Sequence, residues 1–68
     1  IKKGIYEHYK GNRYEVIALA KHSETHEDMV VYQNVADANK IWVHPLAMFL
    51  EDVELHGGTV ARFKYTGK

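Results

Sequence analysis

The densest group of chemically active side chains lies in residues 22–28, which read His-Ser-Glu-Thr-His-Glu-Asp. Imidazole and carboxylate groups are ligands that suit zinc or a similar ion. The spacing does not favour a metal site, because two histidines four residues apart converge only on a helix, whereas Ser, Thr and Asp favour turns. We therefore predict a solvated turn, with no metal and no cofactor. The residues kept as an alternative candidate site are His22, Ser23, Glu24 and His26.

The same segment holds Ser23, His26 and Glu27, which could be written as a catalytic triad. Working triads draw their members from separated positions on a rigid scaffold beside an oxyanion hole, and three neighbours in one loop do not supply this geometry. The sequence also lacks a phosphate-cradling glycine loop and a dinucleotide fingerprint. It therefore indicates no catalytic residue and favours a binding module over an enzyme. The alternative is a small hydrolase, or an accessory subunit that completes a partner enzyme's active site.

Trp42 and His44 lie on one face of a short predicted strand, and Ile41 and Val43 lie on the other. If Ile41 and Val43 point inward, Trp42 is a partly exposed platform on which a base, a proline or an aromatic side chain can stack. The alternative is that Trp42 fills the core, since a small barrel needs a large filler.

Five tyrosines are interleaved with cations in this chain, a combination typical of grooves that bind peptides or single strands. The net charge is zero, but five cations face two carboxylates in residues 1–21, and residues 55–68 hold three cations and no carboxylate. Residues 22–54 hold one cation and seven carboxylates. If the terminal strands are neighbours, positive potential gathers beside them. The predicted ligand-binding residues are Trp42, His44, Tyr14, Arg13 and Arg62.

Short strands separated by turns recur along the whole chain. Strands are predicted over residues 5–9, 13–21, 29–35, 41–44, 53–56 and 59–65, with hairpin signals at Lys10-Gly11-Asn12 and Gly57-Gly58. A helix is the rival prediction for residues 15–22. Pro45 ends the fourth strand and suits the first turn of a helix. We expect an all-β domain, residues 1–68, folded as a small SH3-like barrel or half-barrel of five to six short antiparallel strands, with one short helical turn near Pro45-Leu50.

The composition limits the setting in which this domain works. With 68 residues, the chain has room for one small core. It has no cysteine and so forms no disulfide, which fits a reducing compartment and predicts a cytoplasmic location. No apolar stretch is long enough to cross a membrane. Zero net charge makes general DNA binding an unfavoured function. The expected partner is a protein segment or RNA, and a homo-oligomer is a third interpretation.

Several short motifs in order along the chain resemble a family of short bacterial proteins known as domain of unknown function 1653. The resemblance covers residues 4–67 and implies a bacterial, cytosolic protein with an all-β core, and it implies no catalytic residue. One departure is His44, where the family commonly has arginine. The motifs are Gly4-Ile5-Tyr6, His8-Tyr9-Lys10-Gly11, Tyr14, Val16, His22-Ser23-Glu24-Thr25, Val30-Val31-Tyr32, Trp42-Val43, Pro45-Leu46, Met48-Phe49, Arg62-Phe63 and Tyr65.

Overall fold

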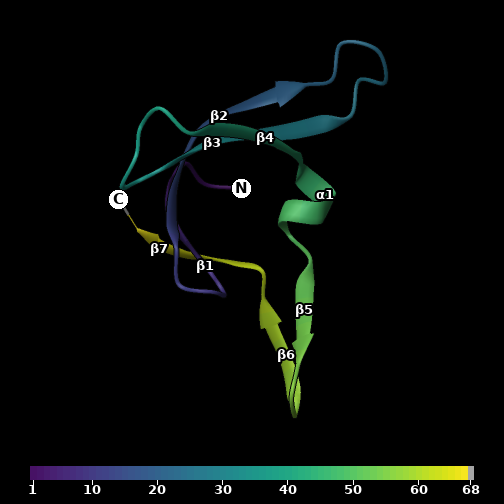
Figure 1. The fold of residues 1–68 in the computed structure, drawn as a ribbon. Helices are drawn as coiled ribbons and strands as arrows, with labels where there is room; N and C mark the ends of the chain where they lie inside the picture. The colour runs from purple at the N-terminus through teal and green to yellow at the C-terminus, as the bar shows by residue number, and fades with distance from the viewer. Residues whose placement is uncertain (68) are drawn as a thin grey trace.

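The computed structural model describes residues 1–67 and consists of short strands around one helical turn (Figure 1). The all-β prediction is confirmed, together with the helical turn after Pro45. The elements are β1 (Gly4–His8), β2 (Arg13–Lys21), β3 (Asp28–Asn34), β4 (Ile41–Pro45), α1 (Leu46–Phe49), β5 (Asp52–Leu55), β6 (Gly58–Ala61) and β7 (Phe63–Gly67).

Five of the strands form one antiparallel sheet in the order β4-β3-β2-β1-β7, and β5 and β6 form a separate hairpin. The large sheet curls, so that β2, β3 and β4 lie above β1 and β7 in Figure 1, with α1 between the two halves at one side. The edge strands β4 and β7 are not neighbours in the sheet. The fold is therefore a half-barrel rather than a closed barrel.

The last predicted strand, residues 59–65, is divided at Arg62 into β6 and β7. The Arg62 backbone N–H donates to the Glu51 carbonyl at 3.1 Å, and the Arg62 carbonyl accepts from the Tyr9 N–H at 3.0 Å. The first bond extends the β5–β6 hairpin by one position beyond the Asp52–Ala61 pair, and the second extends the pairing of β7 with β1, so the chain passes from one pairing to the other at Arg62. The described residues thus form seven strands where five to six were expected.

The second strand is β-structure along its full length, so the rival helix prediction for residues 15–22 is wrong. β2 pairs with β3 from Tyr14 to Lys21, and a bulge between Val16 and Ala18 shifts the register. Bulges increase the local twist of a strand. This bulge lies in the longest strand of the sheet and contributes to its curl.

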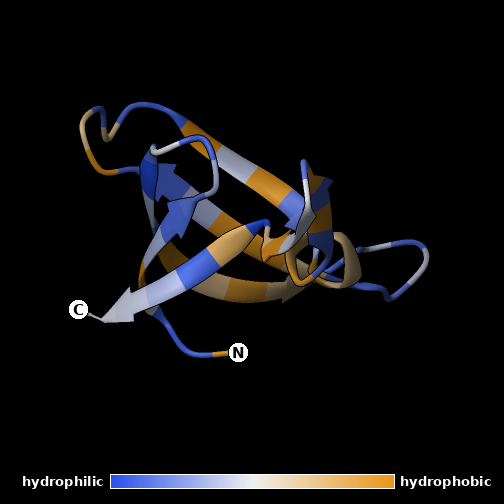
Figure 2. Cartoon of the chain, turned by 90° about the horizontal axis from the view of Figure 1, so that it is seen from below, coloured by the Kyte–Doolittle hydropathy of each residue, from blue (hydrophilic) through white to orange (hydrophobic). Residues whose placement is uncertain are grey.

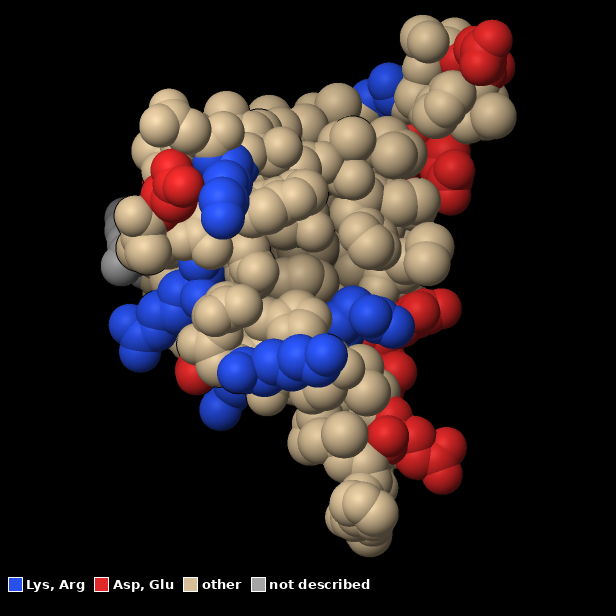
Figure 3. Space-filling model, in the orientation of Figure 1, with Lys and Arg blue, Asp and Glu red and all other residues tan. Residues whose placement is uncertain are grey.

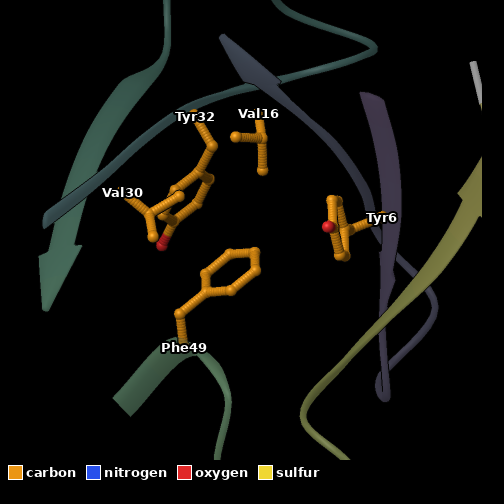
Figure 4. Packing of buried hydrophobic residues seen from close by; sticks show 5 residues of the cluster. All are labelled: Tyr6, Val16, Val30, Tyr32 and Phe49. Atoms are coloured by element: carbon orange, nitrogen blue, oxygen red, sulfur yellow. The ribbon is translucent and has the colours of Figure 1, made fainter. Parts of the chain in front are cut away.

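The core occupies the concave face of the curled sheet (Figure 4). Strand residues alternate between the two faces, which Figure 2 shows as alternating hydrophobic and hydrophilic colour along the strands. α1 places Phe49 against the side chains that β1, β2 and β3 send inward, and Phe49 is 1% exposed. The buried residues are Tyr6, Val16, Val30, Tyr32 and Phe49, with Tyr14, Leu46 and Phe63 packed against them. α1 has four residues, and no helix among residues 1–67 is long and apolar enough to span a membrane.

Candidate functional site

A hollow of about 260 Å³ opens at one end of the concave face. Its lining comes from all five strands of the sheet, including the end of β1, the start of β2 and the start of β7, and from Arg62, because the curl of the sheet turns these positions toward one another. Its lining includes four of the five predicted ligand-binding residues. The lining residues are His8, Tyr14, Tyr32, Trp42, His44, Arg62 and Phe63.

The walls of this hollow are aromatic rings. Trp42 and Tyr32 are directly opposite each other on β4 and β3, and their rings stack with centroids 5.9 Å apart and planes 29° apart. Tyr14 meets the Trp42 ring nearly at a right angle, at 5.5 Å and 84°. Phe63 closes the other side, with its centroid 5.8 Å from that of Tyr14. The sequence thus builds an aromatic surface from four strands of one sheet, β2, β3, β4 and β7.

Trp42 lies on the concave face, yet 39% of its surface is exposed. The sequence analysis expected Trp42 to be exposed if Ile41 and Val43 point inward. They do not point inward, because these two residues are 55% and 59% exposed. Trp42 and His44 point inward instead, and Trp42 is exposed because β4 is an edge strand at the open side of the half-barrel. The exposed aromatic surface is therefore concave rather than flat.

Two buried nitrogen atoms in the lining have no hydrogen-bond partner within the described residues: Nε2 of His44 and Nε of Arg62. One terminal nitrogen of Arg62 lies 3.5 Å from a Glu51 carboxylate oxygen, a long ion pair that leaves Nε unpaired. A buried polar atom without a partner costs about 1–3 kcal/mol, and more when the group is charged. Both nitrogens are themselves out of reach of solvent, although the residues that carry them line the hollow and the Arg62 side chain as a whole is 31% exposed.

His8 is a site residue that the sequence analysis did not select. Its Nδ1 accepts the Lys10 backbone N–H at 3.2 Å, which leaves the proton of the neutral ring on Nε2. Burial, followed by the charges of Lys10 and Arg62, lowers the pKa of His8 below its usual value. The sequence could have indicated His8, because His8 follows Tyr6 by two residues on the same strand and so shares its inward face.

Tyr32 lines the hollow with its ring and carries a buried hydroxyl. Its pKa is raised, first by burial and then by the neighbouring Tyr14. The group therefore stays protonated at neutral pH.

Arg13 is the predicted site residue that the structure places elsewhere. It is exposed and lines a different hollow, together with Gly11, Asn12 and residues 34–36. Arg13 is next to Tyr14 on a strand, and consecutive strand residues point to opposite faces. It therefore lies outside the hollow that Tyr14 lines.

The polar loop of residues 22–27 is folded on its own hydrogen bonds and is apart from the hollow. His22 Nδ1 accepts the backbone N–H groups of Glu24 at 3.1 Å and Thr25 at 3.3 Å, and Thr25 Oγ1 accepts the Glu27 N–H at 3.2 Å. His26 has φ +62°, a left-handed conformation that tightens the turn. No group of three or more potential metal-ligating side chains occurs among residues 1–67.

The surface charges divide as the sequence pattern predicts. In Figure 3 most Lys and Arg lie over the lower strands and most Asp and Glu lie along the right-hand edge, by α1, β5 and the tip of the β2–β3 hairpin, where Lys21 pairs with Asp28. The uncharged surface between these regions is hollowed. A ligand approaching the aromatic wall thus meets cations on one border of it.

Residues 4–65 match the family described as protein of unknown function (DUF1653). The crystal structure of a DUF1653 protein from Bordetella bronchiseptica is similar, with a TM-score of 0.88 and 36% sequence identity. The alignment covers 98% of this chain and 88% of that chain. No curated protein matches the sequence.

Proposed function

This chain belongs to the DUF1653 family, and we propose that it is a noncatalytic interaction module that binds a protein segment or RNA in the hollow beside Trp42. One observation carries the proposal. Four residues selected for ligand binding from the sequence line a single hollow with an aromatic wall: Trp42, His44, Tyr14 and Arg62.

The chemistry of the lining favours binding over catalysis. Within the described part of the chain, the residues lining this hollow include no serine, threonine, cysteine or carboxylate, so they contain no nucleophile paired with a base. Its volume of about 260 Å³ lies just under the roughly 300–1,000 Å³ of small-molecule sites. This space suits one side chain or one base of a longer ligand whose remainder lies on the surface.

The energetics also support a ligand at this place. The Arg62 side chain is 31% exposed, so an acceptor bound in the hollow can pair with the exposed part of its guanidinium, and hydrogen bonds to a charged group are worth about 1.5–3 kcal/mol. The aromatic wall is formed before binding, because Tyr32 is buried in the core. Little conformational entropy is then lost on association, which improves affinity.

Trp42 is the only tryptophan, so its emission and its indole N–H resonance report directly on the hollow. We would titrate the protein with a random single-stranded RNA hexamer pool and, separately, with a pool of proline- and aromatic-containing decapeptides. At least one pool should shift the indole resonance, and Trp42→Ala should lose that binding. Binding that perturbs only the loop of residues 22–27, or that is unchanged by Trp42→Ala, would contradict the proposal.

We also infer that the protein acts in a bacterial cytoplasm. The absence of cysteine and the bacterial source of the similar crystal structure support this location. Fractionation of cells that express the tagged protein tests it.

A further inference from the structure

The outer edge of β4 is a surface that the proposed function does not use. β4 ends the five-stranded sheet, and no other strand within residues 1–67 pairs with its outer edge. We propose that this edge binds a second copy of the chain, so that two β4 strands pair antiparallel about a two-fold axis at Trp42. This inference goes beyond the proposed function, because it does not depend on what the hollow binds.

The backbone of β4 presents four polar groups at this edge. In an antiparallel pair, hydrogen-bonded and non-hydrogen-bonded residue pairs alternate. The Asn34 N–H donates to the Lys40 carbonyl at 3.0 Å, which makes these two residues a hydrogen-bonded pair. Trp42, two residues further along, therefore bonds to β3, and the N–H and C=O groups of Ile41 and Val43 point away from β3. An edge of this kind is a template for another strand.

A second copy pairs with all four groups in one register. When Trp42 lies opposite Trp42 of the second copy, Ile41 lies opposite Val43 of the second copy, and Val43 lies opposite its Ile41. Both of these are hydrogen-bonded pairs, so the two edges exchange four backbone hydrogen bonds, and the Trp42 pair between them is non-hydrogen-bonded. A two-fold axis produces such a contact from two identical surfaces.

The side chains at this edge are apolar and match in the same register. Ile41 and Val43 are more than half exposed on the convex face, and across the axis each covers the other. Trp42 is partly exposed on the concave face, where the two indole rings come into contact. An extended peptide can form the same backbone bonds, whereas a second copy also supplies a matching apolar side chain at all three positions.

The charges favour a second copy at β4 over one at the opposite edge of the sheet. A second copy carries the same charges, so a charged residue at the axis meets its own like charge. Residues 41–43 carry no charge, and Lys40 lies opposite His44 of the second copy rather than opposite another lysine. β7, the other edge of the sheet, carries the exposed Lys64, and lysine is a common protection of edge strands.

The size of the contact sets its strength. β4 has five residues, so the paired edges bury less than the roughly 1,200 Å² at the lower limit of standard interfaces. The dimer should therefore dissociate on dilution. Small cores often depend on a partner for added stability, and this core has five buried hydrophobic residues.

Sedimentation of the whole protein from about 5 μM to about 1 mM tests the assembly. The average mass should rise from one chain toward two, and the emission of the single tryptophan should move to shorter wavelength as Trp42 leaves water. Val43→Lys puts a charge beside the axis and should keep the mass of one chain throughout. Leu55→Lys is the matched control and should dimerise like the wild type, because Leu55 is exposed on β5, in the hairpin far from β4 (Figure 1).

A disulfide tests the register. The chain has no cysteine, so Trp42→Cys carries a single thiol. Residues in a non-hydrogen-bonded pair have Cα atoms about 4.5 Å apart, which a disulfide can bridge. Val43→Cys is the control, because two copies of Val43 are diagonal neighbours about 7–8 Å apart in this register. Under mild oxidation Trp42→Cys should form a linked dimer several-fold faster than Val43→Cys. Amide spectra of each variant confirm that it is folded.

Three outcomes overturn the inference. A wild-type protein with the mass of one chain at the highest concentration, or a dimer that Val43→Lys leaves intact, excludes pairing at β4. Equal rates of linking in the two cysteine variants exclude an axis at Trp42. A monomer whose Ile41 and Val43 amides bind the decapeptide pool rejects the second copy and leaves the interaction module standing. A dimer that binds no ligand supports this inference and rejects the proposed function.

Discussion

The Phe49 ring stacks on the Phe63 ring with centroids 4.1 Å apart and planes 6° apart. Phe49 comes from α1 and is the largest fully buried side chain, and Phe63 begins β7 and lines the hollow. The core and the binding wall are therefore parts of one aromatic cluster. A loss of packing at Phe49 therefore also removes support from Phe63 in the wall of the hollow.

Phe49→Ala should lower the free energy of unfolding by about 3–5 kcal/mol, the range for truncating a buried aromatic ring. Domains are stable by only about 0.05–0.15 kcal/mol per residue, so this loss is a large fraction of the total stability. Urea denaturation followed by circular dichroism measures the loss. Leu50→Ala is the control, because Leu50 is 60% exposed and its truncation should cost less than about 0.5 kcal/mol. Equal losses in both variants would place the core elsewhere.

Trp42→Ala should cost clearly less than Phe49→Ala, about 1–2 kcal/mol, because Trp42 is 39% exposed and part of its area is in water in the folded state. The same urea experiment compares the two. If Trp42→Ala costs about 3–5 kcal/mol, Trp42 is a core residue and not a binding platform.

His8 should make stability depend on pH. The folded protein holds the pKa of His8 below the ordinary value of 6.5, first through burial and then through Lys10 and Arg62. The unfolded chain therefore takes up a proton before the folded one. The stability that neutral His8 contributes is full above about pH 6.5 and falls as the pH drops through the folded pKa.

Two measurements check this expectation. An NMR titration of the His8 ring should give a midpoint below 6.5. His8→Gln should show a smaller decrease in urea midpoint than the wild type between about pH 6.5 and 5. A His8 midpoint at or above 6.5 would show that the imidazole is well solvated.

Gly4 should resist substitution. Its φ is +140°, and a Cβ there would lie 2.8 Å from the Gly67 carbonyl oxygen. Gly4→Ala should thus destabilise the pairing of β1 with β7 by about 1–3 kcal/mol, the usual cost of backbone strain. Gly58→Ala is the matched control, because open space surrounds that position and its φ is not in the left-handed region. Thermal melts of the two variants should differ, and similar melting temperatures would argue against the close approach.

The loop of residues 22–27 should be independent of metal. His22 Nδ1 already accepts two backbone N–H groups, so it is not free to bind an ion. EDTA should leave the melting temperature unchanged, and Ser23→Ala should leave oligonucleotide binding unchanged. Stoichiometric zinc binding that is lost in His22→Ala would contradict this prediction.

The amino-acid sequence alone determined the elements, because strands and turns depend on neighbouring residues. Alternation of inward and outward side chains predicted the strands, and Gly11 marked the first hairpin, where it adopts φ +106°. The same rule places Trp42 with His44 on one face, which the structure confirms. Applied fully, it would also have excluded Arg13, which neighbours Tyr14, and included His8, which shares a face with Tyr6.

Only the tertiary structure decided which strands meet and which face is open. The Arg62 carbonyl accepts from the Tyr9 backbone N–H, a long-range pairing that no local pattern encodes, and this pairing helps to place Arg62 beside the hollow. The direction in which Trp42 points depended on the curl of the sheet, and its exposure depended on β4 being an edge strand. These features depend on the register of all the strand pairs together. They also depend on the packing of Phe49 against the inward side chains of the curled sheet.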